Sequence, residues 1–244
     1  MSQLLATVAA VTPDDATRAA PNPHRPLDLA ALVGPEGWAR LPAAVRRRFG
    51  VGHSDVTYTG RMALRCSPVG RVYALLSRLF GSPLTGANAD VVAAVVRVHG
   101  DGRGGMVWAR SFHTRGSDMP GAARAPHVVR STKRVGVDGG LFEQTAGGLG
   151  MALDVFEEDG SLVFRSRHFE LAIGRRRVPV PALLSPGTCR VTHTDLGGGL
   201  FEFSLDMRHP LWGHTFHQSG VFIDPVADPV TGSGDVRHVD ESAQ

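Results

Sequence analysis

The chain has 244 residues, 42% of them apolar, and a formal net charge of only +3. This apolar content is enough for a hydrophobic core, and the small, scattered positive charge argues against a nucleic-acid surface. The two cysteines form no CxxC pair, and no segment is long and apolar enough for a membrane-spanning helix, so we expect a soluble cytoplasmic protein.

Both ends of the chain are expected to lie outside the folded body. Residues 1–26 end in the proline-rich stretch AAPNPHRP, which is typical of a loose leader. Residues 225–244 contain few apolar residues and several residues that break regular structure, which predicts a disordered tail. A single β-rich domain over residues 27–224 remains.

Two segments early in this body have helical patterns. Residues 42–49 begin with proline and stop before a glycine. In the second segment Ser67 suits the N-cap, and apolar residues that include Val72 and Leu76 then recur at helical spacing. We expect one amphipathic helix over about 68–80, with this apolar stripe packed against the rest of the protein.

The rest of the body consists of short, evenly spaced segments separated by glycine and aspartate turns, which favours antiparallel strands. The candidate strands are 56–64, 91–99, 105–112, 127–135, 150–157, 161–173, 177–181, 188–194, 201–207 and 213–223. No strand–helix alternation and no GxGxxG turn accompany them, which argues against a parallel nucleotide-binding sheet.

So many antiparallel strands leave unpaired edges unless the sheet closes or curls strongly. We therefore predict a mainly β (α+β) fold. Its core is a curled antiparallel β-barrel or half-barrel of about nine or ten strands, with the amphipathic helix packed on or into it.

The segment MVWARSFH places Trp108, Arg110 and Phe112 on one face of a strand. Two interpretations of Arg110 stand. Its stem packs over the tryptophan at the rim with the head in water, or the guanidinium is buried and holds an anionic ligand group or an internal glutamate.

In the segment LVFRSRHFELAI, strict alternation puts Phe164, His168 and Glu170 on one face. His168 and Glu170 form either an acid/base pair beside a cavity or an ordinary surface pair. Together with Arg110 they are the candidate catalytic residues.

The segment PLWGHTFHQSGVF carries His214 and His217, three residues apart. This spacing puts two histidines together on a helix but on opposite faces of a strand, and the glycines favour a strand. We therefore predict that they are not metal co-ligands. The chain also has no HExxH or GxSxG motif, so neither a metal site nor a Ser–His–Asp hydrolase is expected, and no cofactor is expected.

An inner face with aromatic and a few polar residues predicts a site for a small, largely apolar or amphipathic molecule. The ligand-binding candidates are Arg61, Trp108, Phe112, Phe164, His214 and Gln218. The residues leave three functions open: a cofactor-free cyclisation or isomerisation, a carrier without chemistry, and an accessory subunit of a separate dehydrogenase or reductase.

Four stretches keep a distinctive order and spacing: YTGRMALRCSPVGRVYALLSRLFGSPLTG, VWARSFHTRGS, FELAIGRRRVPVPALLSP and GLFEFSLDMRHPLWGHTFHQSGVF. Over about residues 56–223 they resemble the bacterial family catalogued as Domain of Unknown Function 4166. Gly60, Arg61, Trp108, Arg110, Phe112, Pro210 and Gly220 are among the residues at positions of the family pattern.

Gln218 stands where that family often has an aromatic residue, commonly tyrosine, so no role for a tyrosine hydroxyl is carried over. Members of the family occur alone or joined to a dehydrogenase-like nucleotide-binding domain. The resemblance implies work beside redox or biosynthetic enzymes, with a dehydrogenase-like protein as an expected partner, and supplies no known reaction.

Overall fold

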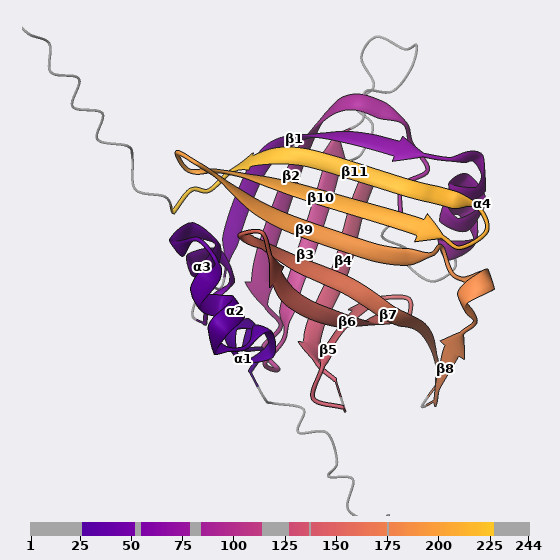
Figure 1. Cartoon of the computed structure of the whole chain (residues 1–244). Helices are drawn as coiled ribbons and strands as arrows, with labels where there is room; N and C mark the ends of the chain where they lie inside the picture. The colour runs from indigo at the N-terminus through magenta and orange to yellow at the C-terminus, as the bar shows by residue number, and fades with distance from the viewer. Residues whose placement is uncertain are drawn as a thin grey trace, which may run out of the picture.

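An antiparallel sheet of eleven strands dominates the part of the chain that the computed structural model describes, residues 26–51, 55–78, 84–113, 127–136, 138–174 and 176–226. The strands are β1 (Val56–Cys66), β2 (Ala89–Gly100), β3 (Met106–His113), β4 (His127–Val135), β5 (Leu141–Thr145), β6 (Leu149–Glu158), β7 (Ser161–Ile173), β8 (Arg176–Val180), β9 (Thr188–Gly197), β10 (Leu200–His209) and β11 (Gly213–Ile223). Ten of them form a ring in chain order, from β1 to β7 and on through β9 and β10 to β11, which pairs with β1 (Figure 1). The predicted antiparallel barrel is confirmed, and it is closed rather than half open.

The eleventh strand, β8, lies outside the ring. β9 pairs with β7 only along residues 162–165, whereas β8 takes the same edge of β7 along residues 169–173. The same edge of β7 therefore pairs with β9 along its first part and with β8 along its last part.

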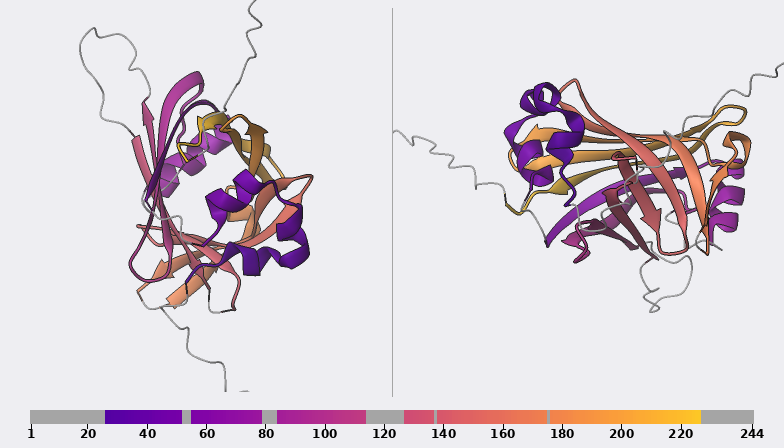
Figure 2. Two further views of the ribbon diagram at one scale, coloured as in Figure 1. Left: turned by 90° about the vertical axis from the view of Figure 1, so that its left-hand side faces the viewer. Right: turned by 90° about the horizontal axis from the view of Figure 1, so that it is seen from below.

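Helices lie at both ends of the barrel (Figure 1). They are α1 (Leu29–Val33), α2 (Pro35–Arg40) and α3 (Ala43–Phe49) at one end, and α4 (Pro68–Ser77) with the one-turn helix η2 (Ala182–Leu184) at the other. Seen along the barrel axis, the first three helices lie across one mouth (Figure 2). The predicted helix over 42–49 corresponds to α3. α1 and α2 have only five and six residues, too few to show a helical period in the sequence.

The inward side chains of the ring strands fill the barrel with apolar and aromatic groups. Phe112, Phe164 and Phe222 are among the fully buried ones. Phe49 of α3 enters the mouth from outside the sheet and stacks on Trp108, with ring centroids 5.8 Å apart. The interior is thus lined by strands and capped at one end by a helix.

α4 begins as predicted, because the Ser67 side chain accepts a hydrogen bond from the backbone N–H of Gly70 at 3.0 Å. Its expected last residues, 79 and 80, lie outside the described residues. The prediction for its apolar stripe is wrong, since Val72 and Leu76 are 57% and 53% exposed. The helix instead buries a face of small residues, Gly70 and Ala74 among them, which lets it approach β1 and β11 closely.

The predicted leader, 1–26, and tail, 225–244, fall almost entirely outside the described residues and stay predictions. Within the described residues, no helix has both the length and the hydrophobicity that crossing a bilayer requires.

The close approach of α4 to the barrel supplies a test. A Cβ atom at Gly70 would clash with the carbonyl oxygen of Thr215 on β11. We expect Gly70→Ala to lower the free energy of unfolding by about 1–3 kcal/mol, as overpacking commonly does. Gly100→Ala is the matched control, because a Cβ there meets nothing within 4 Å. Urea titration compares the two, and equal stability of both variants would contradict this packing.

Candidate functional site

The barrel interior holds the only lysine of the chain in an ion pair. Lys133 projects inward from β4 and Glu143 from β5, and the lysine Nζ lies 2.8 Å from the glutamate Oε2. Their side chains are only 6% and 7% exposed. A lone charge at this depth is strongly unfavourable, so each group depends on the other.

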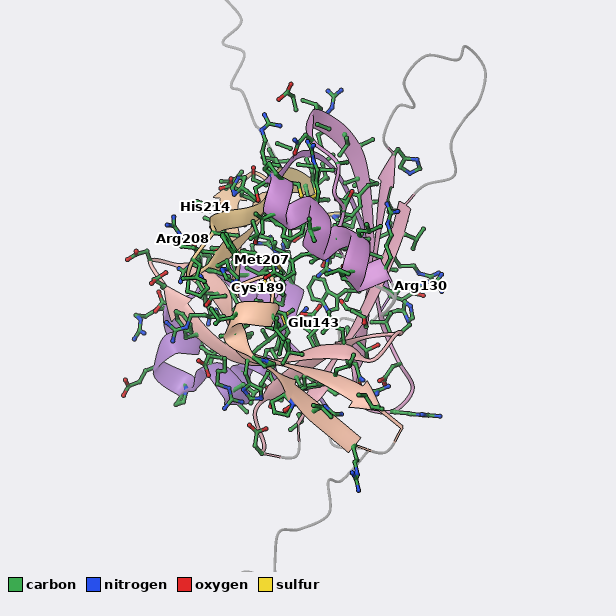
Figure 3. The ribbon with its side chains drawn as sticks, turned by 90° about the vertical axis from the view of Figure 1, so that its right-hand side faces the viewer. Arg130, Glu143, Cys189, Met207, Arg208 and His214 are labelled. Carbon is green, nitrogen blue, oxygen red and sulfur yellow. The ribbon has the colours of Figure 1, made fainter. Side chains whose placement is uncertain are left out.

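Arg110 joins this pair from the neighbouring strand β3. Its Nη2 lies 3.8 Å from Oε1 of Glu143, and its Nη1 donates to the hydroxyl of Ser131 at 3.4 Å. The Ser131 hydroxyl in turn donates to Glu143. We call Arg110, Ser131, Lys133 and Glu143 the interior charge cluster, and the view into the α4 end places Glu143 within the ring of strands (Figure 3).

The surroundings change the proton affinity of these groups. Burial alone would raise the pKa of Glu143, but the charges of Lys133 and Arg110 and hydrogen bonds from Lys133 and Ser131 lower it to about 2. Burial lowers the pKa of Lys133, against the opposing effect of Glu143. Burial and the nearby positive charges also hold the pKa of His193 well below its usual range, so this imidazole is neutral at pH 7.

Aromatic rings surround the interior charge cluster. The Lys133 Nζ lies 4.7 Å from the centroid of the Trp108 ring and 5.6 Å from that of Phe164. His193 on β9 meets Phe49 edge to face at 4.8 Å. Nε1 of Trp108 and Nδ1 of His193 are buried, and neither has a hydrogen-bond partner among the described residues. Buried polar atoms are rarely left in this state, so these two nitrogens call for an explanation.

Two cavities meet at Phe49 and Trp108. The inner one measures about 30 Å³, room for about two water molecules, and Arg110, His193 and Phe203 are among the residues that line it. The second measures about 240 Å³, lies toward the end covered by α1 and α3, and reaches Lys133. Arg48, Phe49, Val98 and Trp108 line both spaces.

Five of the predicted site residues lie in the interior. Trp108, Phe112, Phe164 and Gln218 have buried, inward-facing side chains. Arg110 lies among them, with a side chain that is 12% exposed. Of the two interpretations of Arg110, the structure agrees with the buried guanidinium beside an internal glutamate.

His168 and Glu170 do meet, but on the outer face of β7. Their side chains are 47% and 23% exposed, with His168 Nε2 3.0 Å from Glu170 Oε1. The reason is a β-bulge: Leu153 pairs with Ser166 and Ala152 with His168, so Arg167 is an extra residue that reverses the alternation. Of the two interpretations, the structure agrees with the surface pair, and His168 lines a groove on the outer surface rather than the interior.

His214 and Arg61 also point away from the interior. Arg61 is an exposed residue of β1, next to the inward Gly60 and Met62. His214 is 55% exposed, because a bulge at Thr215 separates it from the inward face of Phe216.

The same bulge corrects the expectation for the two histidines. His214 and His217 both face Asp206 on the outer side of β10, with Nδ1–Oδ1 distances of 3.9 and 2.8 Å. They share a face instead of lying on opposite faces. No group of three or more His, Cys, Asp or Glu residues suited to a metal ion occurs among the described residues.

Sequence reasoning missed Lys133, Glu143 and His193. β5, which carries Glu143, has five residues and follows a glycine turn, too short for a clear alternation. One signal was available: Lys133 is the only lysine in a chain otherwise rich in arginine. A single exception to such a bias draws attention to its position, because lysine and arginine are not interchangeable in a buried ion pair.

A groove of about 740 Å³ lies on the outer surface where β7 and β9 separate. Four arginines line it, Arg165, Arg167, Arg190 and Arg208. The first three form ion pairs with neighbouring carboxylates. Arg208 has no acidic partner among the described residues, and Figure 3 shows it beside His214 on the outer side of the barrel.

The lowered pKa of Glu143 predicts acid lability. Its contribution to stability is complete above its ordinary pKa of 4.5 and is lost as the pH falls through about 2, because the unfolded chain takes up this proton first. The loss amounts to about 3 kcal/mol at most. We expect acid unfolding curves of the wild type to show this loss, and Lys133→Met/Glu143→Gln to lack that part of the pH dependence.

Glu143→Gln alone should be less stable than this double variant, since it leaves two buried cations without a carboxylate and costs about 3–5 kcal/mol. Identical pH profiles for the wild type and the double variant would show that Glu143 is not ionised in the folded protein.

Comparison with known proteins places these features in a family. The crystal structure of Rv2717c from M. tuberculosis is similar at a TM-score of 0.39 and 13% sequence identity, over 75% of this chain and 98% of that chain. No curated protein matches the chain. The family model described as a domain of unknown function, DUF4166, matches residues 41–222. The chain therefore belongs to the DUF4166 family.

Proposed function

We propose that the barrel holds a small amphipathic molecule, with an anionic head group at the interior charge cluster and an apolar body along the aromatic lining. The observation that carries this proposal is the charge of the cluster. Arg110 and Lys133 are two cations, and Glu143 is the single carboxylate between them. A bound carboxylate would complete the charge balance of the interior.

The two unpartnered ring nitrogens support the same proposal. The indole N–H of Trp108 can only donate a hydrogen bond, so it calls for an acceptor atom on the occupant. Both Trp108 and His193 line the inner cavity together with Arg110. A carboxylate or carbonyl oxygen placed there would accept from the Trp108 indole N–H, and from His193 in the tautomer that carries its proton on Nδ1.

The size of the interior defines how such a molecule binds. The inner cavity alone is too small for more than about two water molecules, whereas the adjoining cavity measures about 240 Å³. Phe49 stands between them and is carried by α3, a helix of seven residues at the mouth. Displacement of this ring would join the two spaces into one site for an aliphatic chain of moderate length.

Octanoate and 1-octanol form a matched pair for testing this binding by isothermal titration calorimetry. We expect octanoate to bind at least tenfold more tightly than octanol, because hydrogen bonds to charged groups are worth about 1.5–3 kcal/mol. Arg110→Gln should remove this preference. Arg61→Gln, on the outer face, is the control and should keep it. Failure of both ligands to bind, or equal affinity for the two, would refute the proposal.

A cofactor-free chemical step on the bound molecule is the second candidate function. It is favoured by the distance of 2.8 Å between the Lys133 amine and the Glu143 carboxylate beside the cavity. Because burial lowers the pKa of Lys133, this amine releases a proton more easily than an exposed lysine does. His168 and Glu170 lie outside the barrel and cannot contact an interior ligand.

Deuterium exchange separates a catalyst from a carrier. In deuterium oxide, a catalyst would accelerate exchange at the carbon next to the ketone of 2-oxooctanoate, as followed by NMR. Lys133→Met would abolish the acceleration, and His168→Gln would leave it unchanged. Binding of the compound without accelerated exchange would favour a carrier.

A further inference from the structure

Seven large apolar side chains are exposed together at the α4 end of the barrel. They are Val72, Leu75 and Leu76 of α4, Leu183 and Leu184 of η2, and Leu211 and Trp212 of the β10–β11 turn. Each is between 53% and 69% exposed. We call these residues the end patch. Single exposed apolar residues are ordinary, but a gathered set of this size marks an interaction surface.

Contacts beneath the end patch hold its three segments together. The Tyr73 hydroxyl donates to the carbonyl of Leu183 at 3.2 Å, which joins α4 to η2. The Tyr73 ring lies 6.0 Å from that of His209, which stacks on Trp212 at 5.8 Å. His209 Nδ1 also accepts the backbone N–H of Leu211 at 3.1 Å. The patch is therefore a preformed surface, and its segments lie at the same end of the barrel in Figure 1.

The charged residues of the three segments that carry the end patch are all basic. Residues 67–78, 181–190 and 207–215 contain no aspartate or glutamate. Arg71, Arg78 and Arg208 are exposed in these segments, and none has an acidic partner among the described residues. Two carboxylates on the strands β2 and β10, Asp90 and Asp206, are engaged by Arg65 and by His217. An apolar surface flanked by arginines that have no acidic partner among the described residues is complementary to an apolar layer covered with negative charge.

α4 has the features of a helix that lies in a membrane interface. It buries its small residues against the barrel and turns Val72, Leu75 and Leu76 outward. Arg71 and Arg78 flank these side chains, and long arginine side chains can reach head groups while their stems stay in apolar surroundings. Trp212 adds an amphipathic ring of the kind enriched at the level of the head groups.

We propose that the end patch docks the barrel on the surface of a bilayer that contains anionic phospholipid. Val72, Leu75, Leu76 and Trp212 enter the interface, and Arg71, Arg78 and Arg208 contact the phosphate-bearing head groups. This surface lies outside the barrel, so the docking does not depend on whether the interior binds a ligand.

Vesicle co-sedimentation tests the docking. The intact chain is mixed with vesicles of phosphatidylcholine alone, or of phosphatidylcholine with phosphatidylglycerol. We expect binding to the phosphatidylglycerol vesicles to be at least tenfold stronger and to weaken as salt is added. Leu75→Ser/Leu76→Ser should reduce binding at least tenfold. Arg71→Gln/Arg78→Gln should reduce it about tenfold and abolish the preference for the anionic lipid.

The matched control is Leu200→Ser/Ile223→Ser, which replaces two exposed apolar residues paired on neighbouring strands away from the end patch. It should bind vesicles as the wild type does. Trp212 provides a second readout, since its fluorescence should shift to the blue on the anionic vesicles and Trp212→Phe should remove the shift. The buried Trp108 should not respond.

Two results would overturn the docking. One is wild-type binding that does not exceed that of Leu75→Ser/Leu76→Ser. The other is the absence of vesicle binding together with a protein complex that the Leu75→Ser/Leu76→Ser substitutions dissociate. That complex would be either a dimer seen in analytical ultracentrifugation or a complex with a dehydrogenase-like protein. The end patch would then be a protein interface.

Discussion

Ring closure of the sheet is the constraint on which the other features depend. The pairings of β6 with β7 and of β1 with β11 leave the ten ring strands without a free edge along most of their length. Closure gives every strand one face toward the interior and one toward the outside. A charged residue on the inner face must therefore find its partner inside. Lys133 and Glu143, from neighbouring strands, meet this requirement at 2.8 Å.

A second set of ion pairs secures the mouth. Arg48 of α3 lies 3.3 Å from both Asp195 of β9 and Asp224 beyond β11, and Arg47 lies 3.1 Å from Asp224. Two cations face two carboxylates here, so this network is balanced. The same helix places Phe49 over Trp108. α3 is thus held at the rim by balanced ion pairs, while the interior charge cluster, with two cations and one carboxylate, lies deeper in the barrel.

The sequence was sufficient to predict the barrel, because closure follows from the number and spacing of the strands. It was also sufficient to place Trp108, Arg110 and Phe112 on one face, since β3 has no register shift with either neighbour. Alternation failed on β7 and β11, where Arg167 and Thr215 are extra residues. A bulge is decided by pairing with another strand, and nothing local in the sequence marks it.

Lys133 and Glu143, the partners of Arg110 in the interior charge cluster, escaped prediction for a related reason. Glu143 lies ten positions after Lys133, and only the hairpin of β4 and β5 brings the two side chains opposite each other, with Lys133 paired to Glu143 in the register. A contact between strands cannot be read from either strand alone. The sequence therefore predicted the strands that form the barrel but not the Lys133–Glu143 ion pair, which depends on the register between two strands.

The two ends of the barrel differ in how their helices are attached to the sheet. One mouth is covered by α3, which is fixed by buried ion pairs. The other carries α4, whose Val72, Leu75 and Leu76 side chains are exposed, because the helix packs on the sheet mainly through glycine and alanine. Packing through large residues would have buried that stripe and stabilised the domain further. That stabilisation is left unused at this end, so the exposed stripe would gain the same free energy from any apolar surface that covered it.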